Sequence, residues 1–219
     1  MRRLLALAFT ILVLATAADA RAQPVSPVPD RDIPWQTVTG VTLAVGAATQ
    51  LLMPRAFYAD PEVTVGWKAR WHVSVLAPVM TLAMLTALNE VALKDVFKGN
   101  RPDCDESNQG LPNCTTYGMM STHSFGGFSS FGHGAAVFIF DTYKWSDGRF
   151  NGWSFAGNVV APFSLAMVTA IGRGVGNWET GGQILLGGIT GLGIGFLSGM
   201  TYSLMQRPEC GYTGSLICW

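Results

Sequence analysis

The sequence predicts an all-α protein: a membrane-embedded bundle of five helices, or of six if the N-terminal segment is retained. Three observations predict this class. Five apolar segments each approach the roughly 20 residues that a helix needs to cross a bilayer. Charged residues make up 13% of the chain, against about 25% in an average soluble domain. Tryptophans lie near the ends of the segments, as in the aromatic belt of a membrane interface.

The N-terminus has the pattern of an export signal. Arg2 and Arg3 form the charged region, residues 4–14 form the apolar core, and a small-residue cleavage site ends at Ala20 or Ala22. An uncleaved first membrane helix is the alternative. The chain thus divides into a signal peptide at 1–22, an extended lead-in with four prolines at 23–34, one helical domain at 35–206 and a C-terminal tail at 207–219.

The five apolar segments follow the lead-in and are separated by short polar stretches. They cover residues 36–53, 72–93, 123–143, 153–172 and 182–205. The first is the shortest and carries several threonines, which makes it the least apolar. The last is apolar nearly all round, whereas a core helix of a soluble protein should show an amphipathic stripe. A soluble periplasmic helical domain is the alternative to the membrane bundle.

Loop cations indicate how the bundle is oriented. If the mature N-terminus is outside, the loops at 54–71 and 144–152 face the cytoplasm, and they hold five cations, as the positive-inside tendency requires. Segments 94–122 and 173–181 then lie together on the outer side. The sequence therefore predicts a bacterial-type inner-membrane protein that brings these two segments to one periplasmic surface.

The four cysteines form two close pairs, Cys104 with Cys114 and Cys210 with Cys218. In an exported protein such pairs favour disulfides, and we expect a disulfide between Cys104 and Cys114. The predicted topology leaves the second pair in the cytoplasm, so either these are free thiols or the last segment does not cross. Neither pair has a histidine at zinc-ligand spacing, so we expect no metal site and no cofactor.

The first chemical motif is a pair of cations, Lys94 and Arg101, directly after the second apolar segment. Seven residues are nearly two helical turns, so both cations would project from one face of a helix that Pro102 closes. Two such cations can clamp a phosphate group. The alternative is a positively charged helix end at a membrane surface, to which Lys98 would also belong.

This K-x6-R-P pattern resembles the first signature of the type 2 phosphatidic acid phosphatase (vanadium haloperoxidase-like) superfamily. The other signatures of that superfamily are P-S-G-H and S-R-x5-H-x3-D. The resemblance implies a phosphatidic acid phosphatase type 2-like helical domain over 35–206. It also implies that Lys94, Arg101 and Arg173 bind the phosphate of a lipid phosphate or another phosphate ester.

Two histidines compete for the second signature, in which the histidine of the superfamily is the general acid. His123 follows Ser121, and His133 follows Gly132. The helix that starts at His123 has 21 residues before Lys144, enough to span a bilayer, whereas His133 leaves 11. We therefore expect His123 to be the general acid, with His133 as the alternative. His133 would otherwise lie mid-helix as an interhelical hydrogen bonder.

The third signature keeps its spacing but not its functional groups. Arg173 matches the phosphate-binding arginine, whereas Glu179 replaces the nucleophilic histidine and Gln183 replaces the aspartate that orients it. A carboxylate can be phosphorylated in other enzyme classes, so Glu179 is a candidate catalytic residue. Beside Arg101 and Arg173 it would instead pair with them and repel an incoming phosphate. We expect the usual phosphohistidine chemistry to be impaired.

Three functions follow from these patterns. The first is a membrane protein with a periplasmic phosphate-binding site, whose status as a phosphatase is open because Glu179 replaces the nucleophile. The second is a catalytically inactive relative that binds a lipid headgroup or an envelope partner. The third is a structural membrane protein with chance matches. A formal net charge of zero gives no case for nucleic acid, and the oligomeric state is not predicted.

Overall fold

The computed structural model describes residues 33–52, 73–93, 96, 99–102, 104, 114 and 120–205. The predicted signal peptide, most of the lead-in, the C-terminal tail, Lys94, Cys210, Cys218 and the loop at 54–71 lie outside these residues. Within them the chain is all helical, without strands. The elements are α2 (Ile33–Leu52), α3 (Val73–Leu88), η3 (Asn89–Leu93), α5 (Thr122–Phe140), η4 (Asp141–Trp145), α6 (Gly152–Phe155), η5 (Ala156–Val160), α7 (Ala161–Val175) and α8 (Gly181–Met205).

Each of the five predicted apolar segments is helical, and three of them include a turn of π-helix. Two helical stretches, Gly152–Val175 and Gly181–Leu204, are long and apolar enough to cross a membrane. Met80–Leu93 is also apolar but shorter, and no other helix among the described residues meets this criterion. The lead-in was expected to stay extended to residue 34, but α2 begins at Ile33 because proline is tolerated in the first turn of a helix.

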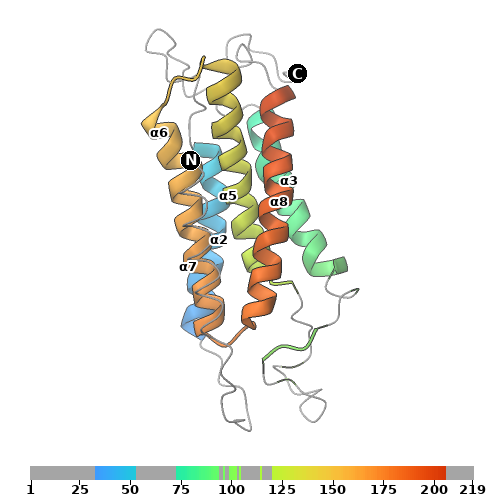
Figure 1. Ribbon diagram of the computed structural model, residues 1–219. Coiled ribbons are helices and arrows are strands. Elements are labelled where there is room, and N and C mark those ends of the chain that lie inside the picture. Colours follow the sequence, from blue (N-terminus) through green and yellow to red (C-terminus); the bar gives the residue numbers. More distant parts are fainter. Residues whose placement is uncertain are drawn as a thin grey trace.

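Helix α5 is the central element of the bundle. It packs against α2, α3, α7 and α8, and Figure 1 shows it between the α2–α7 pair and the α3–α8 pair. Glycine and serine dominate its buried surface, and the hydroxyls of Ser129 and Ser130 donate hydrogen bonds to backbone carbonyls. Small side chains with satisfied hydroxyls let neighbouring helices approach α5 closely.

Helices α5 and α8 meet backbone to backbone along most of their length. Every fourth residue of α8 on the contact face is glycine, and a Cβ atom there would lie 2.1–2.5 Å from a carbonyl oxygen of α5. We call this contact the glycine seam. Its glycines are Gly187, Gly191, Gly195 and Gly199, and the facing carbonyls belong to Ser121, Phe125, Ser129 and His133. Any larger residue in the seam would push the two helices apart.

The outward faces of the helices carry many large apolar side chains. Met84 on α3 is 69% exposed, Val175 on α7 is 65% exposed and Leu197 on α8 is 57% exposed. In the two longest apolar stretches, 39% and 33% of the residues are buried. A core helix of a soluble protein is mostly buried, so these faces differ from such a helix.

Candidate functional site

Three segments that are distant in the sequence meet at the end of the bundle where α5 and α8 begin. Arg101 Nη1 donates to the carbonyl of Trp178 over 3.4 Å, which joins the loop after η3 to the α7–α8 turn. The backbone N–H of Ser121 donates to the carbonyl of Gln183 over 3.1 Å, which joins the start of α5 to α8. The described residues of the loop after η3, of the start of α5 and of the α7–α8 turn therefore meet at one end of the bundle.

Arg173 and Glu179 form a buried ion pair at this site. Nη2 of Arg173 lies 3.0 Å from Oε1 of Glu179, and the two side chains are 3% and 0% exposed. Arg173 is in the last turn of α7, where a cation also meets the negative end of the helix dipole. The chain then turns back through Asn177, whose φ of 54° is left-handed. Glu179 thus pairs with Arg173 as expected.

The ion pair leaves polar atoms without partners. Among the described residues, neither Nε nor Nη1 of Arg173 has a hydrogen-bond acceptor, and Oε2 of Glu179 has no donor. The indole ring of Trp178 covers the guanidinium at 5.1 Å. A buried polar group without a partner costs about 1–3 kcal/mol. Two unused donors on one buried guanidinium therefore indicate a place where an anion or ordered water binds.

Arg101 is the second cation of the site and is half-buried. Burial lowers the pKa of its guanidinium, the carboxylates of Glu179 and Glu90 oppose this effect, and the charge of Arg173 adds to it. The charges of Arg101, Arg173, Glu179 and Glu90 therefore interact at this site. The guanidinium groups of this site attract a phosphate, and its carboxylates repel one.

Arg101 was expected on a helix that continues from Lys94, and this expectation is wrong. Val96 is the last described helical residue before the loop, and residues 99–101 are not helical. Arg101 precedes Pro102, and the residue before a proline is disfavoured in the helical conformation. The loop is held instead by the predicted disulfide between Cys104 and Cys114, with an S–S distance of 1.99 Å. The backbone N–H of Cys104 donates to the carbonyl of Arg101 over 3.1 Å.

Gln183 joins the parts of the site. Its Oε1 accepts from the N–H of Thr180 over 2.9 Å, and its own N–H donates to the Thr180 hydroxyl over 3.3 Å. This reciprocal pair is a capping box that starts α8. Nε2 of Gln183 donates to the carbonyl of Asn100 over 2.7 Å. Because Asn100 precedes Arg101, Gln183 positions the cationic loop as well as capping the helix.

The two candidate histidines lie at different depths of α5. His123 is in the first turn, two residues after Ser121, whose hydroxyl caps the helix by accepting from the N–H of Ser124. His133 lies ten residues further along, about 15 Å of helix. It is buried, and its Nδ1 is 3.3 Å from the hydroxyl of Ser198 on α8. His123 is therefore at the site end, and His133 makes the expected interhelical contact.

Sequence reasoning missed Glu90. Its carboxylate accepts a hydrogen bond from the hydroxyl of Thr122, which links η3 to the first turn of α5. Asn89 is fully buried beside it and donates to the hydroxyl of Thr122 over 3.1 Å. Glu90 lies four residues before Lys94 in the sequence. One helical turn separates such residues, and this spacing was a signal that could have identified it.

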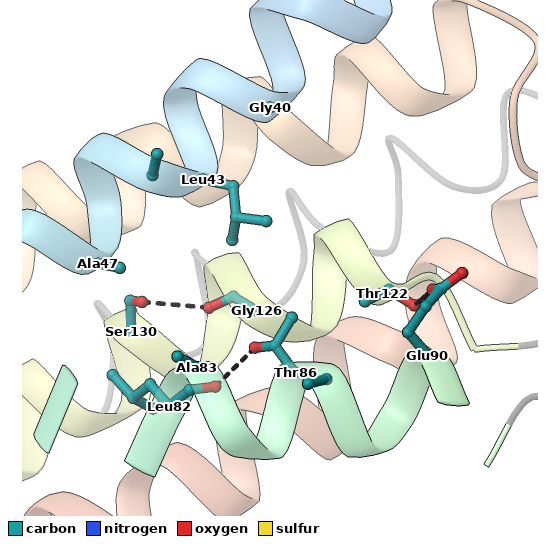
Figure 2. Close-up of a pocket in the computed structure, with 12 residues that line it drawn as sticks. Gly40, Leu43, Ala47, Leu82, Ala83, Thr86, Glu90, Thr122, Gly126 and Ser130 are labelled. Atoms are coloured by element: carbon teal, nitrogen blue, oxygen red, sulfur yellow. Dashed lines mark hydrogen bonds between the residues drawn. The ribbon is translucent and has the colours of Figure 1, made fainter. Parts of the chain in front are cut away.

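A groove lies between α2, α3 and α5, and Figure 2 shows its lining residues. Its volume is about 420 Å³. The hydroxyls of Thr86 and Ser130 donate to carbonyls of their own helices, so the middle of the groove offers an apolar lining. Glu90 and Thr122 lie together at one end of the view. We call this feature the lateral groove.

Comparisons with protein-family models, curated proteins and solved structures find no match to this chain. The chemistry of the site must therefore be argued from its own residues. In the described part of the chain, no group of three or more His, Cys, Asp or Glu side chains could hold a metal ion. The two guanidinium groups can bind an anion, and the carboxylate of Glu179 lies 3.0 Å from Nη2 of Arg173.

Proposed function

We propose that this chain is a membrane protein that binds a phosphate monoester at Arg101 and Arg173 and does not hydrolyse it through a phosphohistidine. The observation that carries the proposal is the buried guanidinium of Arg173, whose Nε and Nη1 lack acceptors among the described residues. Nε and Nη1 lie on different edges of the planar guanidinium, and each is an unused N–H group that can donate to an oxygen of a phosphate. Arg101 adds a second charge to the same site.

The resemblance to the phosphatase superfamily supports phosphate over other anions. Arg101 and Arg173 are the residues that correspond to its phosphate-binding arginines, and the described contacts bring their segments together. Lys94 corresponds to the third cation and belongs to this proposal through the resemblance alone. A carboxylate ligand would satisfy the same donors, so competition between phosphate and acetate tests the selectivity of the site.

The uncovered apolar faces support a membrane location. Large apolar side chains are exposed on α2, α3, α7 and α8, and water would make such extended faces a source of aggregation. A bilayer covers them instead. The distribution of loop cations in the sequence supports an orientation with the site on the periplasmic side of a bacterial-type inner membrane.

The ion pair between Arg173 and Glu179 is the reason why we expect the protein not to hydrolyse the phosphate ester. Nucleophilic attack needs a group with an available lone pair in line with the phosphorus atom, and the superfamily uses a histidine where this chain has Glu179. Oε1 of Glu179 is bonded to Arg173, and both atoms are buried. A carboxylate oxygen that is paired with an arginine is a weaker nucleophile, because its lone pair is engaged by the guanidinium. We therefore expect binding with little or no release of inorganic phosphate.

The test is calorimetric titration of the purified protein with inorganic phosphate and with vanadate. Arg173→Gln should weaken binding at least about tenfold, a change of about 1.4 kcal/mol. Arg149→Gln is the matched control, because Arg149 is exposed in the turn between η4 and α6. Arg101→Gln gives a second variant if Arg173→Gln does not fold. Equal phosphate affinity in all three variants and the wild type would overturn the proposal.

A second candidate function is hydrolysis with Glu179 as nucleophile, and one observation favours it: Oε2 of Glu179 has no donor among the described residues. Oε2 would attack the phosphorus, the bond from phosphorus to the ester oxygen would break, and the alcohol would leave after taking a proton from water. A second water would then hydrolyse the acyl phosphate, which releases inorganic phosphate and restores the carboxylate. Phosphate release from a panel of lipid phosphates at about 1–1000 per second, abolished by Glu179→Gln, would establish this function. It would also replace the non-catalytic proposal.

A further inference from the structure

We propose that Glu179 selects the protonation state of the ligand, so that the site binds a phosphate that keeps one acidic proton and donates it in a hydrogen bond to Oε2 of Glu179. This inference rests on the proposed function and deepens it, because it names the bound species as the hydrogen phosphate form of a monoester. It also predicts that the site rejects sulfate, which is also a tetrahedral oxyanion but carries no proton at neutral pH. Glu179 thereby becomes a specificity-determining residue.

The unpaired atoms of the Arg173–Glu179 ion pair are of opposite kinds. Nε and Nη1 of Arg173 are unused donors, and Oε2 of Glu179 is an unused acceptor. A guanidinium can only donate hydrogen bonds, and an ionised carboxylate can only accept them. The bond between Nη2 and Oε1 uses one atom of each group. A ligand that satisfies all three remaining atoms must therefore offer acceptors and a donor together.

The three unpaired atoms all belong to one ion pair. Nη2 of Arg173 and Oε1 of Glu179 are 3.0 Å apart. Nε and Nη1 are bonded to the same carbon as Nη2, and Oε2 is bonded to the same carbon as Oε1. An anion that accepts from Nε or Nη1 therefore lies close to the carboxylate. One small ligand can contact both residues.

Burial makes the unused acceptor important for selectivity. The side chains of Arg173 and Glu179 are 3% and 0% exposed. An anion without a proton would place an oxygen against Oε2, and like charges repel more strongly where water does not screen them. An anion with a proton replaces this repulsion by a charge-assisted hydrogen bond. The same carboxylate therefore disfavours one form of the ligand and favours the other.

The neighbouring charges also favour the protonated form. The charges that act on Arg101 are those of Arg173, Glu179 and Glu90. These two cations and two carboxylates sum to zero, so they favour the ligand form with the smaller negative charge. A phosphate monoester has a second pKa of about 6, and below it the ester carries one negative charge fewer. Binding can therefore retain the proton near neutral pH.

The first experiment compares inorganic phosphate with sulfate by calorimetric titration of the purified protein in detergent at neutral pH. The wild type should bind phosphate at least about 100-fold more tightly, because a site built to bond a hydroxyl rejects an analogue that lacks it. Glu179→Gln can present an amide N–H in place of Oε2, so sulfate should gain affinity and the preference should fall below about tenfold.

The matched control is Asp147→Asn, which also replaces a carboxylate by an amide. Asp147 is exposed in the turn between η4 and α6, and its φ of 50° is also tolerated by asparagine. This variant should keep the full preference for phosphate over sulfate.

A second experiment needs no variant and decides the question if Glu179→Gln does not fold. It compares methyl phosphate with inorganic phosphate on the wild type from about pH 6 to about pH 8. Methyl phosphate loses its last proton above a pKa of about 6, whereas inorganic phosphate keeps one. The affinity for methyl phosphate should therefore fall at least about tenfold relative to that for inorganic phosphate. The charged and titratable groups described at this end of the bundle act on both ligands and cancel in the ratio. They are Arg101, Arg173, Glu90, Glu179 and His123.

The outcomes separate this inference from the proposed function. If phosphate and sulfate bind the wild type equally well, or if Glu179→Gln keeps the preference, the inference is wrong and the phosphate site stands. A constant ratio of the two phosphate affinities across the pH range also overturns it. If neither phosphate nor sulfate binds at any pH, the proposed function fails and the inference fails with it.

Discussion

The two sides of α5 use small residues for opposite purposes. On the α8 side, glycines let the two backbones touch, and a Cβ atom at Gly195 would lie 2.1 Å from the carbonyl oxygen of Ser129. On the α2–α3 side, glycine and alanine border an open groove of about 420 Å³. A Cβ atom at Gly40, which lines that groove, meets nothing within 4 Å.

This difference shows that composition alone does not decide whether small residues bring two helices into contact or leave a groove between them. In the glycine seam, the four glycines recur every fourth residue and form one stripe on α8. A stripe of this kind lets a helix lie directly on its partner. In the lateral groove, the small residues come from three helices whose larger neighbours, such as Leu43, hold the walls apart. We therefore expect the α5–α8 contact at the glycine seam to be rigid, and we expect the lateral groove to have room for a ligand.

The largest expected loss of stability comes from a substitution in the glycine seam. Gly195→Ala places a methyl group against a backbone carbonyl that cannot move without moving α5, so it should cost about 3 kcal/mol or more in unfolding free energy. Gly193→Ala is the matched control, because a Cβ atom there meets nothing within 4 Å. The control should be neutral or stabilising by up to about 1 kcal/mol. Thermal and denaturant unfolding in detergent measure both, and equal stabilities would contradict the seam.

An intermediate effect tests the junction between the seam and the site. Gln183→Glu keeps the acceptor of the capping box but replaces the amide that donates to Asn100. A carboxylate facing a carbonyl oxygen repels it, so we expect a loss of about 1–3 kcal/mol in stability. Phosphate affinity should fall as well, because the loop that carries Arg101 is no longer held. The measurement is a thermal scan with and without phosphate, and a stability loss without a change in phosphate affinity would limit Gln183 to capping.

The smallest changes in stability are expected for substitutions that line the groove. Gly126→Ala places a methyl group near the flexible ends of Leu43 and Thr86, so the side chains can adjust and the cost should be about 1 kcal/mol. Gly40→Ala should be neutral or slightly stabilising, because the added Cβ atom points into open space. Unfolding measurements on both variants compare them directly. A cost at Gly40 as large as at Gly195 would show that the groove is closed.

The helices were largely predictable, because an apolar run is a local property of the sequence. The five expected segments coincide with α2, α3 with η3, α5 with η4, α6 to α7, and α8, with differences of a few residues at their ends. The disulfide was also predictable, since two cysteines ten residues apart in a loop have few other partners. The ion pair of Glu179 with Arg173 was also expected, because the resemblance places this carboxylate beside the phosphate-binding arginines.

Other parts of the site were not predicted. Gln183 was interpreted only as a lost aspartate, whereas the structure gives it a capping box and a bond to Asn100. Glu90 had no assigned role, and its contact with Thr122 joins residues 32 positions apart. The helical clamp expected at Arg101 is a non-helical loop, because Pro102 follows it. The bond from Gln183 to Asn100 and the contact of Glu90 with Thr122 join distant segments, whereas the capping box and the effect of Pro102 are local.

The sequence by itself determined where the helices lie, which residue types could meet a phosphate, and that α8 carries glycine every fourth residue. These properties are local, because they depend on neighbours within a few turns of one helix. Only the tertiary structure decided that the glycines of α8 face α5 and that α2 and α3 leave a groove. The reason is that a glycine stripe allows close packing but does not specify the helix that packs against it, which depends on the rest of the bundle.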